Sequence, residues 1–194
     1  VYSLKVEGRL KSPEYVAVVT EVYRRALDDL AAGRFDPEDP APVEKLRQIF
    51  NRGGFTQGHA GGAEDAALCA PERVSHEGLP LGTVASVRGK LARIRLIRPL
   101  HDGDSLQLRQ RQDADLRYSG PETPAGQEAV LRLRPGLTAA PGTEVARLSD
   151  ARQLEAARSH APKPIPVQMR GFFALNRPMT LTLSDGESTV TVEG

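Results

Sequence analysis

Residues 82–96 read GTVASVRGKLARIRL, and their apolar and polar side chains alternate on both sides of Arg88-Gly89. Alternation with a period of two is typical of a half-buried strand, and a glycine between two such runs is typical of a hairpin turn. The sequence therefore predicts two antiparallel strands, at residues 82–87 and 90–96.

Four more short runs of the same kind follow, and glycine or proline residues separate them. They lie at residues 105–108, 116–119, 128–134 and 143–149. Six short strands at this close spacing are typical of a small closed or partly open β-barrel. We therefore expect the middle of the chain to form such a barrel.

The end of the chain predicts a helix, a stiff linker and a second small sheet. Asp150 precedes an amphipathic run that ends near His160, and the proline-rich linker APKPIP follows. Three alternating runs then occupy residues 167–175, 178–185 and 188–194. We expect these runs to pair as an antiparallel meander.

The beginning of the chain predicts a short strand and a long helix. Residues 1–6 alternate weakly, and Ser12-Pro13-Glu14 is a typical helix start, because each of these residue types suits the first turn of a helix. Gly33 is the expected end of this helix, and a shorter helix is expected at residues 43–50. The long helix carries an apolar stripe at Val16, Val19, Tyr23, Leu27 and Leu30.

These patterns together predict a mainly β protein of the α+β class. The expected parts are a strand and helix with a glycine-rich connection, a small β-barrel, a helix with its linker, and a truncated meander. Their boundaries are 1–62, 63–149, 150–164 and 165–194. The chain begins on Val1 and stops directly after a strand pattern, so we expect it to be a part of a longer protein.

The composition restricts the chemistry of the chain. The single cysteine, Cys69, excludes a disulfide within the chain and favours a reducing, cytoplasmic compartment. No run is apolar enough to span a membrane, and no signal peptide is visible. The four histidines lack the spacing of metal ligands, so we expect no metal or cofactor in this chain and an inert, buried cysteine. No complete active site is recognisable.

The opening stretch SLKVEGRLKSPEYV, residues 3–16, carries the densest charge pattern. Lys5, Glu7, Arg9 and Lys11 alternate, so in an extended chain they share one face. A carboxylate between cations stays ionised and can orient an arginine toward a phosphate or carboxylate. The alternative is an ordinary ion-paired strand end.

The segment NRGGFTQGHAGG, residues 51–62, contains five glycines but neither of the common phosphate-loop patterns. Its polar residues are either ligand groups or turn residues, and the pattern favours turn residues. The candidates are Asn51, Arg52, Gly53, Gly54 and Thr56, with Gln57 and His59.

Residues 88–134 carry ten Lys and Arg against six Asp and Glu, which is the most basic part of the chain. Arginines that alternate with apolar residues lie on the outer face of half-buried strands, where a stripe of them can follow a phosphate backbone. The alternative is a solvated strand surface, and with only Tyr118 nearby base stacking is not expected. The candidate RNA contacts are Arg88, Lys90, Arg93, Arg95, Arg109, Arg111, Arg132 and Arg134, next to Arg98.

Four motifs carry a resemblance to a known family: SLKVEGRLKSPEYVAVVTEVYRRALD, IFNRGGFTQGH, APERVSHEGLPLGTV and PLHDGDSLQL. In order and spacing they resemble the later part of the collagenase-like peptidase family U32. The last two are also similar to the small β-barrel of translation factors. The resemblance extends from Ser3 to about Asp150, and the tail from Lys163 resembles the start of the extra domain of the longer members.

This resemblance implies a TIM-like barrel in front of Val1, whose last strand and helix are residues 3–6 and 12–30. It places Lys5, Glu7 and Arg9 at the carboxyl end of a barrel strand, as residues that line the site. It also implies an iron–sulfur cluster held by cysteines upstream of this chain, to which Cys69 does not correspond.

The longer members resemble an oxygen-independent enzyme that hydroxylates cytidine in large-subunit ribosomal RNA, and shorter relatives act on tRNA or in ubiquinone synthesis. The implied partners are therefore the missing barrel and ribosomal RNA. Leu4, Val6 and the helix stripe are expected to be exposed here, or covered by a second copy. A collagenase-like peptidase and a non-catalytic interaction module stay as alternatives.

Overall fold

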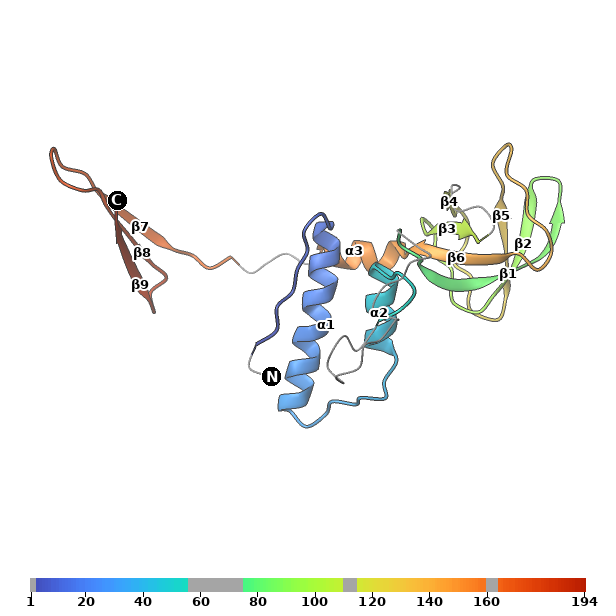
Figure 1. The fold of residues 1–194 in the computed structure, drawn as a ribbon, viewed down its shortest axis with the longest axis horizontal. Helices are drawn as coiled ribbons and strands as arrows, with labels where there is room; N and C mark the ends of the chain where they lie inside the picture. Colours follow the sequence, from blue (N-terminus) through green and yellow to red (C-terminus); the bar gives the residue numbers. More distant parts are fainter. Residues whose placement is uncertain (1–2, 56–74, 110–114, 160–163) are drawn as a thin grey trace, which may run out of the picture. The chain divides into compact units, whose positions relative to one another are not determined.

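The computed structural model describes residues 3–55, 75–109, 115–159 and 164–194. The chain divides into two units, Val1–Ser159 and His160–Gly194. Helices and a six-stranded sheet make up the first unit, and a three-stranded sheet makes up the second (Figure 1). In the described ranges no helix combines the length and the apolar character that crossing a membrane requires. The expected mainly β architecture of the α+β class is confirmed.

The first helix, α1 (Pro13–Ala31), begins and ends where the sequence predicts. The Ser12 hydroxyl accepts a hydrogen bond of 3.3 Å from the Tyr15 N–H, and Gly33 follows the helix with a φ of 68°. Val18, Val19 and Val22 are its buried residues. The remaining members of the predicted stripe are exposed, namely Val16, Tyr23, Leu27 and Leu30.

The strand expected at residues 3–6 is not formed, and this prediction was wrong. Residues 3–8 have no regular structure, and a turn follows in which the Lys11 N–H donates to the Gly8 carbonyl. Leu4 and Val6 are exposed, and no described residue pairs with this segment as a neighbouring strand. A strand is stable only when its backbone groups bond to a partner, so the alternating sequence alone does not produce one.

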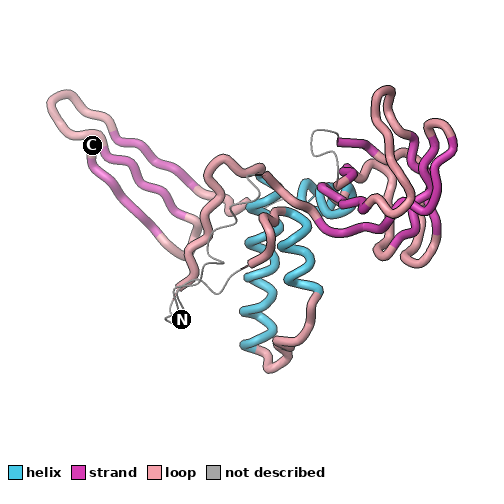
Figure 2. The backbone as a smooth tube through the Cα atoms, turned by 45° about the vertical axis from the view of Figure 1, so that its right-hand side comes forward, coloured by secondary structure: helices cyan, strands magenta, loops and turns pink. Residues whose placement is uncertain are grey.

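The six-stranded sheet is antiparallel throughout, and its order is β4-β3-β6-β1-β2-β5. It curls into a partly open barrel (Figure 2) in which β4 and β5 are the two edges. All six strands lie where the alternation predicts them. Their bounds are β1 (Leu79–Arg88), β2 (Leu91–Leu96), β3 (Ser105–Leu108), β4 (Asp115–Arg117), β5 (Glu128–Arg132) and β6 (Glu144–Ser149).

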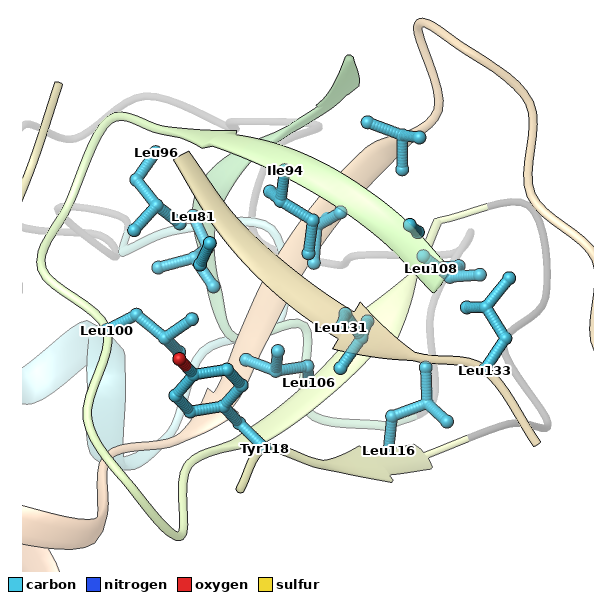
Figure 3. Close-up of a cluster of buried hydrophobic side chains, with 14 of the residues drawn as sticks. Leu81, Ile94, Leu96, Leu100, Leu106, Leu108, Leu116, Tyr118, Leu131 and Leu133 are labelled. Carbon is cyan, nitrogen blue, oxygen red and sulfur yellow. The ribbon is translucent and has the colours of Figure 1, made fainter. Parts of the chain in front are cut away.

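The inner faces of these strands form the main hydrophobic core. Figure 3 shows leucines from several strands and the Tyr118 ring directed into one interior. In β2, Ala92, Ile94 and Leu96 are buried, and the residues between them are exposed. Each fully buried leucine contributes about 1.5–3 kcal/mol relative to exposure, so this core is the main source of stability of the first unit.

Two short helices join the sheet at one end: α2 (Ala41–Ile49) and α3 (Ala151–Ser159) (Figure 1). The Asp150 carboxylate accepts from the N–H groups of Arg152 and Gln153, which confirms the predicted cap of α3. Gln48 is the buried residue of α2. The helices therefore meet the barrel through polar groups.

Arg147 of β6 is the centre of this polar contact. Its guanidinium donates to the Gln48 side chain at 2.8 Å and to the Pro99 carbonyl at 3.0 Å. It also lies 3.1 Å from the Asp150 carboxylate and 3.6 Å from that of Asp104. Only 8% of the side chain is exposed. One buried cation thus binds α2, the start of α3 and the loop before β3 to the end of β6.

The chain also approaches Arg147 closely where it enters β1. Gly78 has a φ of 65°, and a Cβ at this position would collide with the Arg147 carbonyl oxygen. Glycine is the residue type that meets both requirements without strain. The position of β1 beside β6 therefore depends on this glycine.

The second unit is the predicted meander of β7 (Gln168–Phe172), β8 (Thr180–Ser184) and β9 (Thr189–Glu193). Its register places apolar side chains on one face and polar ones on the other. The apolar face consists of Met169, Gly171, Leu181, Leu183, Val190 and Val192. Its outer members are exposed, Met169 by 65% and Val190 by 61%.

We predict that Arg147→Met destabilises the first unit by about 3–5 kcal/mol, because it leaves two largely buried carboxylates without their cation. Urea unfolding measures this change. Arg93→Met is the matched control in strand β2 of the same sheet, and its exposed side chain predicts a change within about 0.5 kcal/mol. Equal effects of the two substitutions would contradict the structural role of Arg147.

A second prediction concerns the ion pair of 2.8 Å between Glu14 of α1 and Arg158 of α3. The hydrogen bond from Arg158 lowers the pKa of Glu14 from 4.5 to about 2. The pair therefore stabilises the fold above pH 4.5, and its contribution is lost as the pH falls toward 2. Thermal unfolding should show Glu14→Gln less stable than the parent at pH 7, with the difference shrinking below pH 4.5. A difference that is independent of pH would argue against the pair.

Candidate functional site

The charged opening segment lies on the surface. Lys5 and Glu7 form an ion pair of 2.9 Å with side chains that are 84% and 72% exposed, and Arg9 is exposed in the turn that follows. An exposed pair of this kind contributes little to stability. The side chains of Lys5, Glu7 and Arg9 are therefore accessible to a ligand or to a further part of the protein.

The glycine-rich segment begins with a tight turn. The Gly54 N–H donates to the Asn51 carboxamide oxygen at 2.6 Å, and the Gly53 N–H donates to the Glu77 carboxylate at 2.9 Å. Both glycines have a positive φ. These amides are used within the protein, which agrees with turn residues rather than a phosphate loop. Thr56, Gln57 and His59 lie outside the described residues.

The structure brings the opening segment and the glycine-rich turn together around Phe50. The Lys11 ammonium lies 3.1 Å from the centre of the Phe50 ring, and the Arg52 guanidinium lies 5.2 Å from it. Tyr15 contacts the ring edge-on at 6.2 Å, and His76 stacks on it at 5.6 Å. We call Lys11, Phe50 and Arg52 the cationic cluster.

His76 fixes the position of this cluster relative to the barrel. Its Nε2 lies 2.8 Å from the Leu148 carbonyl, and its Nδ1 accepts from the Asn51 N–H at 2.9 Å. A carbonyl oxygen can only accept, so the hydrogen of the ring is on Nε2. The imidazole therefore joins the glycine-rich turn to the end of β6.

Two positive charges share the Phe50 ring, and no described carboxylate forms an ion pair with Lys11 or Arg52. Burial and the nearby Arg52 lower the pKa of Lys11. The two cations repel each other, and their contact with the aromatic face of Phe50 compensates part of this repulsion. An anion such as a phosphate would compensate the rest, so the cluster is a candidate site for an anion.

The basic residues of the barrel separate into distinct groups. Arg93 and Arg95 lie 3.8 Å and 3.7 Å from the Glu128 carboxylate, and Arg109 donates to the Glu77 carbonyl at 3.0 Å. Arg98, next to the predicted stripe, forms an ion pair of 2.7 Å with Glu44. Arg111 lies outside the described residues. The exposed members for which the described part of the chain shows no ion pair are Arg88, Lys90, Arg132 and Arg134.

A further polar cluster places atoms of His101, Asp104 and Asp150 within 4.8 Å of one another, a spacing that suits a metal ligand set. Arg147 occupies the space beside both carboxylates, and Asp104 also accepts from the Ala151 and His101 N–H groups. Burial raises the pKa of Asp104 against these contacts. The charge that a metal would supply already comes from the arginine, so we interpret the cluster as structural.

The chain does not fit an iron–sulfur cluster of its own. Cys69 is its single cysteine and lies outside the described residues, whereas such clusters are held by several thiolates. The family resemblance assigns those ligands to a segment upstream of this chain.

Sequence reasoning missed the contribution of Lys11 and Phe50. Lys11 continues the alternation of Lys5, Glu7 and Arg9, so the charge pattern already contained it. Phe50 lies far from Lys11 in the sequence, and no local pattern indicates their contact. Gln48 and Arg147 were missed because polar residues in a short helix and a strand usually face solvent.

Comparison with known families identifies the segment that carries the cationic cluster. Residues 1–68 match the model of peptidase family U32. This match confirms the resemblance to family U32 for the first two of the four motifs, which lie within residues 1–68.

Two curated relatives match part of the chain at high identity. Both are tRNA hydroxylation protein P, from Escherichia coli K12 and from Haemophilus influenzae, with 48% and 47% identity over 58 residues. The match covers 30% of this chain and 12% of each relative, so it spans only a small part of their length. No solved structure matches the chain.

We predict that Arg52→Gln raises the pKa of the Lys11 ammonium, because it removes the nearby positive charge. The remaining lowering is due to burial, so the pKa should stay below its ordinary value. An NMR titration of the lysine side chain measures the change. Arg88→Gln, in the β1–β2 hairpin, is a control that should leave the Lys11 pKa unchanged. An unaltered pKa in Arg52→Gln would place the two cations further apart than described.

Proposed function

We propose that this chain is the C-terminal part of a U32 protein that hydroxylates RNA without oxygen, and that its target is cytidine in large-subunit ribosomal RNA. The observation that carries the proposal is the identity of 48% and 47% over 58 residues with tRNA hydroxylation protein P from two bacteria. The cationic cluster, within the residues that match the family model, supports it, because its chemistry suits a phosphate.

In this proposal the chain alone is inactive, since it lacks a complete set of catalytic residues. Lys5, Glu7 and Arg9 complete a site whose other groups are on a preceding TIM-like barrel. The exposed apolar residues Leu4 and Val6 agree with a surface that a further part of the protein covers. Upstream cysteines would hold an iron–sulfur cluster that supplies redox chemistry, and the protein would act in the cytoplasm.

The six-stranded barrel is the RNA-binding accessory part in this proposal. Residues 88–134 are the most basic part of the chain, and most of their arginines lie on the outer faces of strands. Tyr118 is buried in the core, so contact with RNA would use phosphates rather than stacked bases.

A peptidase activity is the second candidate, and the family description is what favours it. It would require Glu7 to act on a peptide rather than to orient RNA. The described residues contain no nucleophile and base in contact in this segment. RNA hydroxylation is therefore the function that the charges support better.

The test uses the full-length protein that contains this chain, expressed in bacteria that lack their own RNA hydroxylation proteins. Mass spectrometry of digested ribosomal and transfer RNA then measures hydroxylated nucleosides. We predict hydroxycytidine in the large-subunit RNA, and its loss with Glu7→Gln. The matched control is Glu187→Gln, which neutralises another exposed carboxylate, in the turn between β8 and β9, and should leave the product unchanged.

The other outcomes separate the alternatives. Hydroxyuridine in tRNA would keep the reaction and replace the proposed target. Cleavage of gelatin by the protein, lost with Glu7→Gln and without any modified nucleoside, would replace hydroxylation by peptidase activity. A protein with neither activity would support the non-catalytic interaction module.

A further inference from the structure

The open edge of the barrel contains a cationic cleft that the sequence pattern does not reveal. A cavity of about 500 Å³ lies between the segment that begins with β4 and the segment that ends β5. We call it the seam cleft, because these strands are the two edges of the sheet. Its polar wall on the β5 side is formed by Arg132 and Arg134.

The described lining of the seam cleft carries charges of one sign. Three arginines line it, namely Arg117, Arg132 and Arg134, and none of its described lining residues is an aspartate or a glutamate. In the described part of the chain none of the three forms an ion pair. Arg117 belongs to the β4 wall, with its guanidinium turned toward Gly103, so the charge of the cleft comes mainly from the two arginines of the β5 side.

The arginines of β2 differ from Arg132 and Arg134 in their charged neighbours. Arg93 and Arg95 of β2 have the same exposed position on an outer face, but Glu128 of β5 lies within 3.8 Å of both. That carboxylate reduces the positive potential there, whereas no described carboxylate forms an ion pair with Arg132 or Arg134. The predicted arginine stripe therefore has two parts. The charges of Arg93 and Arg95 are partly compensated by Glu128, and no described carboxylate compensates those of Arg132 and Arg134.

The floor of the seam cleft determines what it can recognise. Tyr118, Leu131 and Leu133 are almost fully buried in the core, as Figure 3 shows. The Tyr118 hydroxyl donates to the Pro121 carbonyl at 2.9 Å. A ligand in the cleft meets guanidinium groups above a closed apolar floor, with no free aromatic face for a base. These groups suit the phosphates of a flexible strand.

We propose that the seam cleft binds the phosphodiester backbone of single-stranded RNA, independently of its sequence, through Arg132 and Arg134. This inference rests on the proposed function and specifies which barrel surface meets the RNA. It assigns the contact to the uncompensated arginines and not to Arg93 and Arg95.

The test measures binding of a mixed-sequence oligoribonucleotide to the whole chain across a series of salt concentrations. Each phosphate contact on a single strand contributes about 0.7 to the slope of log affinity against log salt. The variant R132Q/R134Q should flatten the slope by about 1.4 and weaken binding on the order of tenfold at the lowest salt. R93Q/R95Q is the matched control and should change the slope much less.

Two further variants test the reason for the effect. R132K/R134K keeps the charges and should retain most of the salt slope. All four side chains are exposed, so circular dichroism and thermal unfolding should be unchanged in each variant. A lost fold therefore does not explain lost binding.

The outcomes distinguish this inference from the proposed function. If the parent chain binds RNA and both double variants weaken it equally, or neither does, the seam cleft is not the contact, while the RNA function stands. If the parent chain shows no salt-dependent RNA binding, the accessory role of the barrel fails together with the inference. If an acidic peptide binds the parent but not R132Q/R134Q, and RNA does not compete, the cleft serves a protein partner and the proposal is overturned.

Discussion

The arrangement of the first unit depends on one buried guanidinium. Arg147 lies near the end of β6, and it is held there by Gln48 of α2, by the Pro99 carbonyl and by two carboxylates. Such a group is costly to bury and is tolerated because its charge is paired and hydrogen-bonded. It therefore sets the position of the helices on the barrel more strictly than an apolar contact would. His76 bonds to the end of β6 and stacks on Phe50, so it fixes the cationic cluster relative to the same end of the barrel.

Local patterns predicted most of the elements. The alternation in residues 82–96 and the four runs after it were sufficient, because each strand has one face in a single core. Ser12-Pro13 and Asp150 fixed helix starts for equally local reasons. Residues 3–6 show the limit of this approach, since an alternating sequence becomes a strand only beside a partner.

The candidate sites were predicted less well, because they depend on contacts between distant segments. The sequence indicated that Arg93, Arg95, Arg132 and Arg134 share an exposed face, and all four are exposed in the structure. It did not indicate that Glu128 lies beside only two of them, since this follows from the register of β2 with β5. Likewise, the contact of Lys11 with Phe50 arises from the packing of α1 beside α2.

The apolar face of the meander has a thermodynamic consequence for the second unit. The three strands leave this face largely uncovered. They therefore lack most of the hydrophobic burial that normally offsets the entropy cost of ordering the backbone. A surface that covers the face binds the folded strands and not the unfolded ones, so it stabilises them by mass action. The folded fraction of this unit is then a function of the concentration of that surface. For a meander covered in this way, folding and association are one equilibrium.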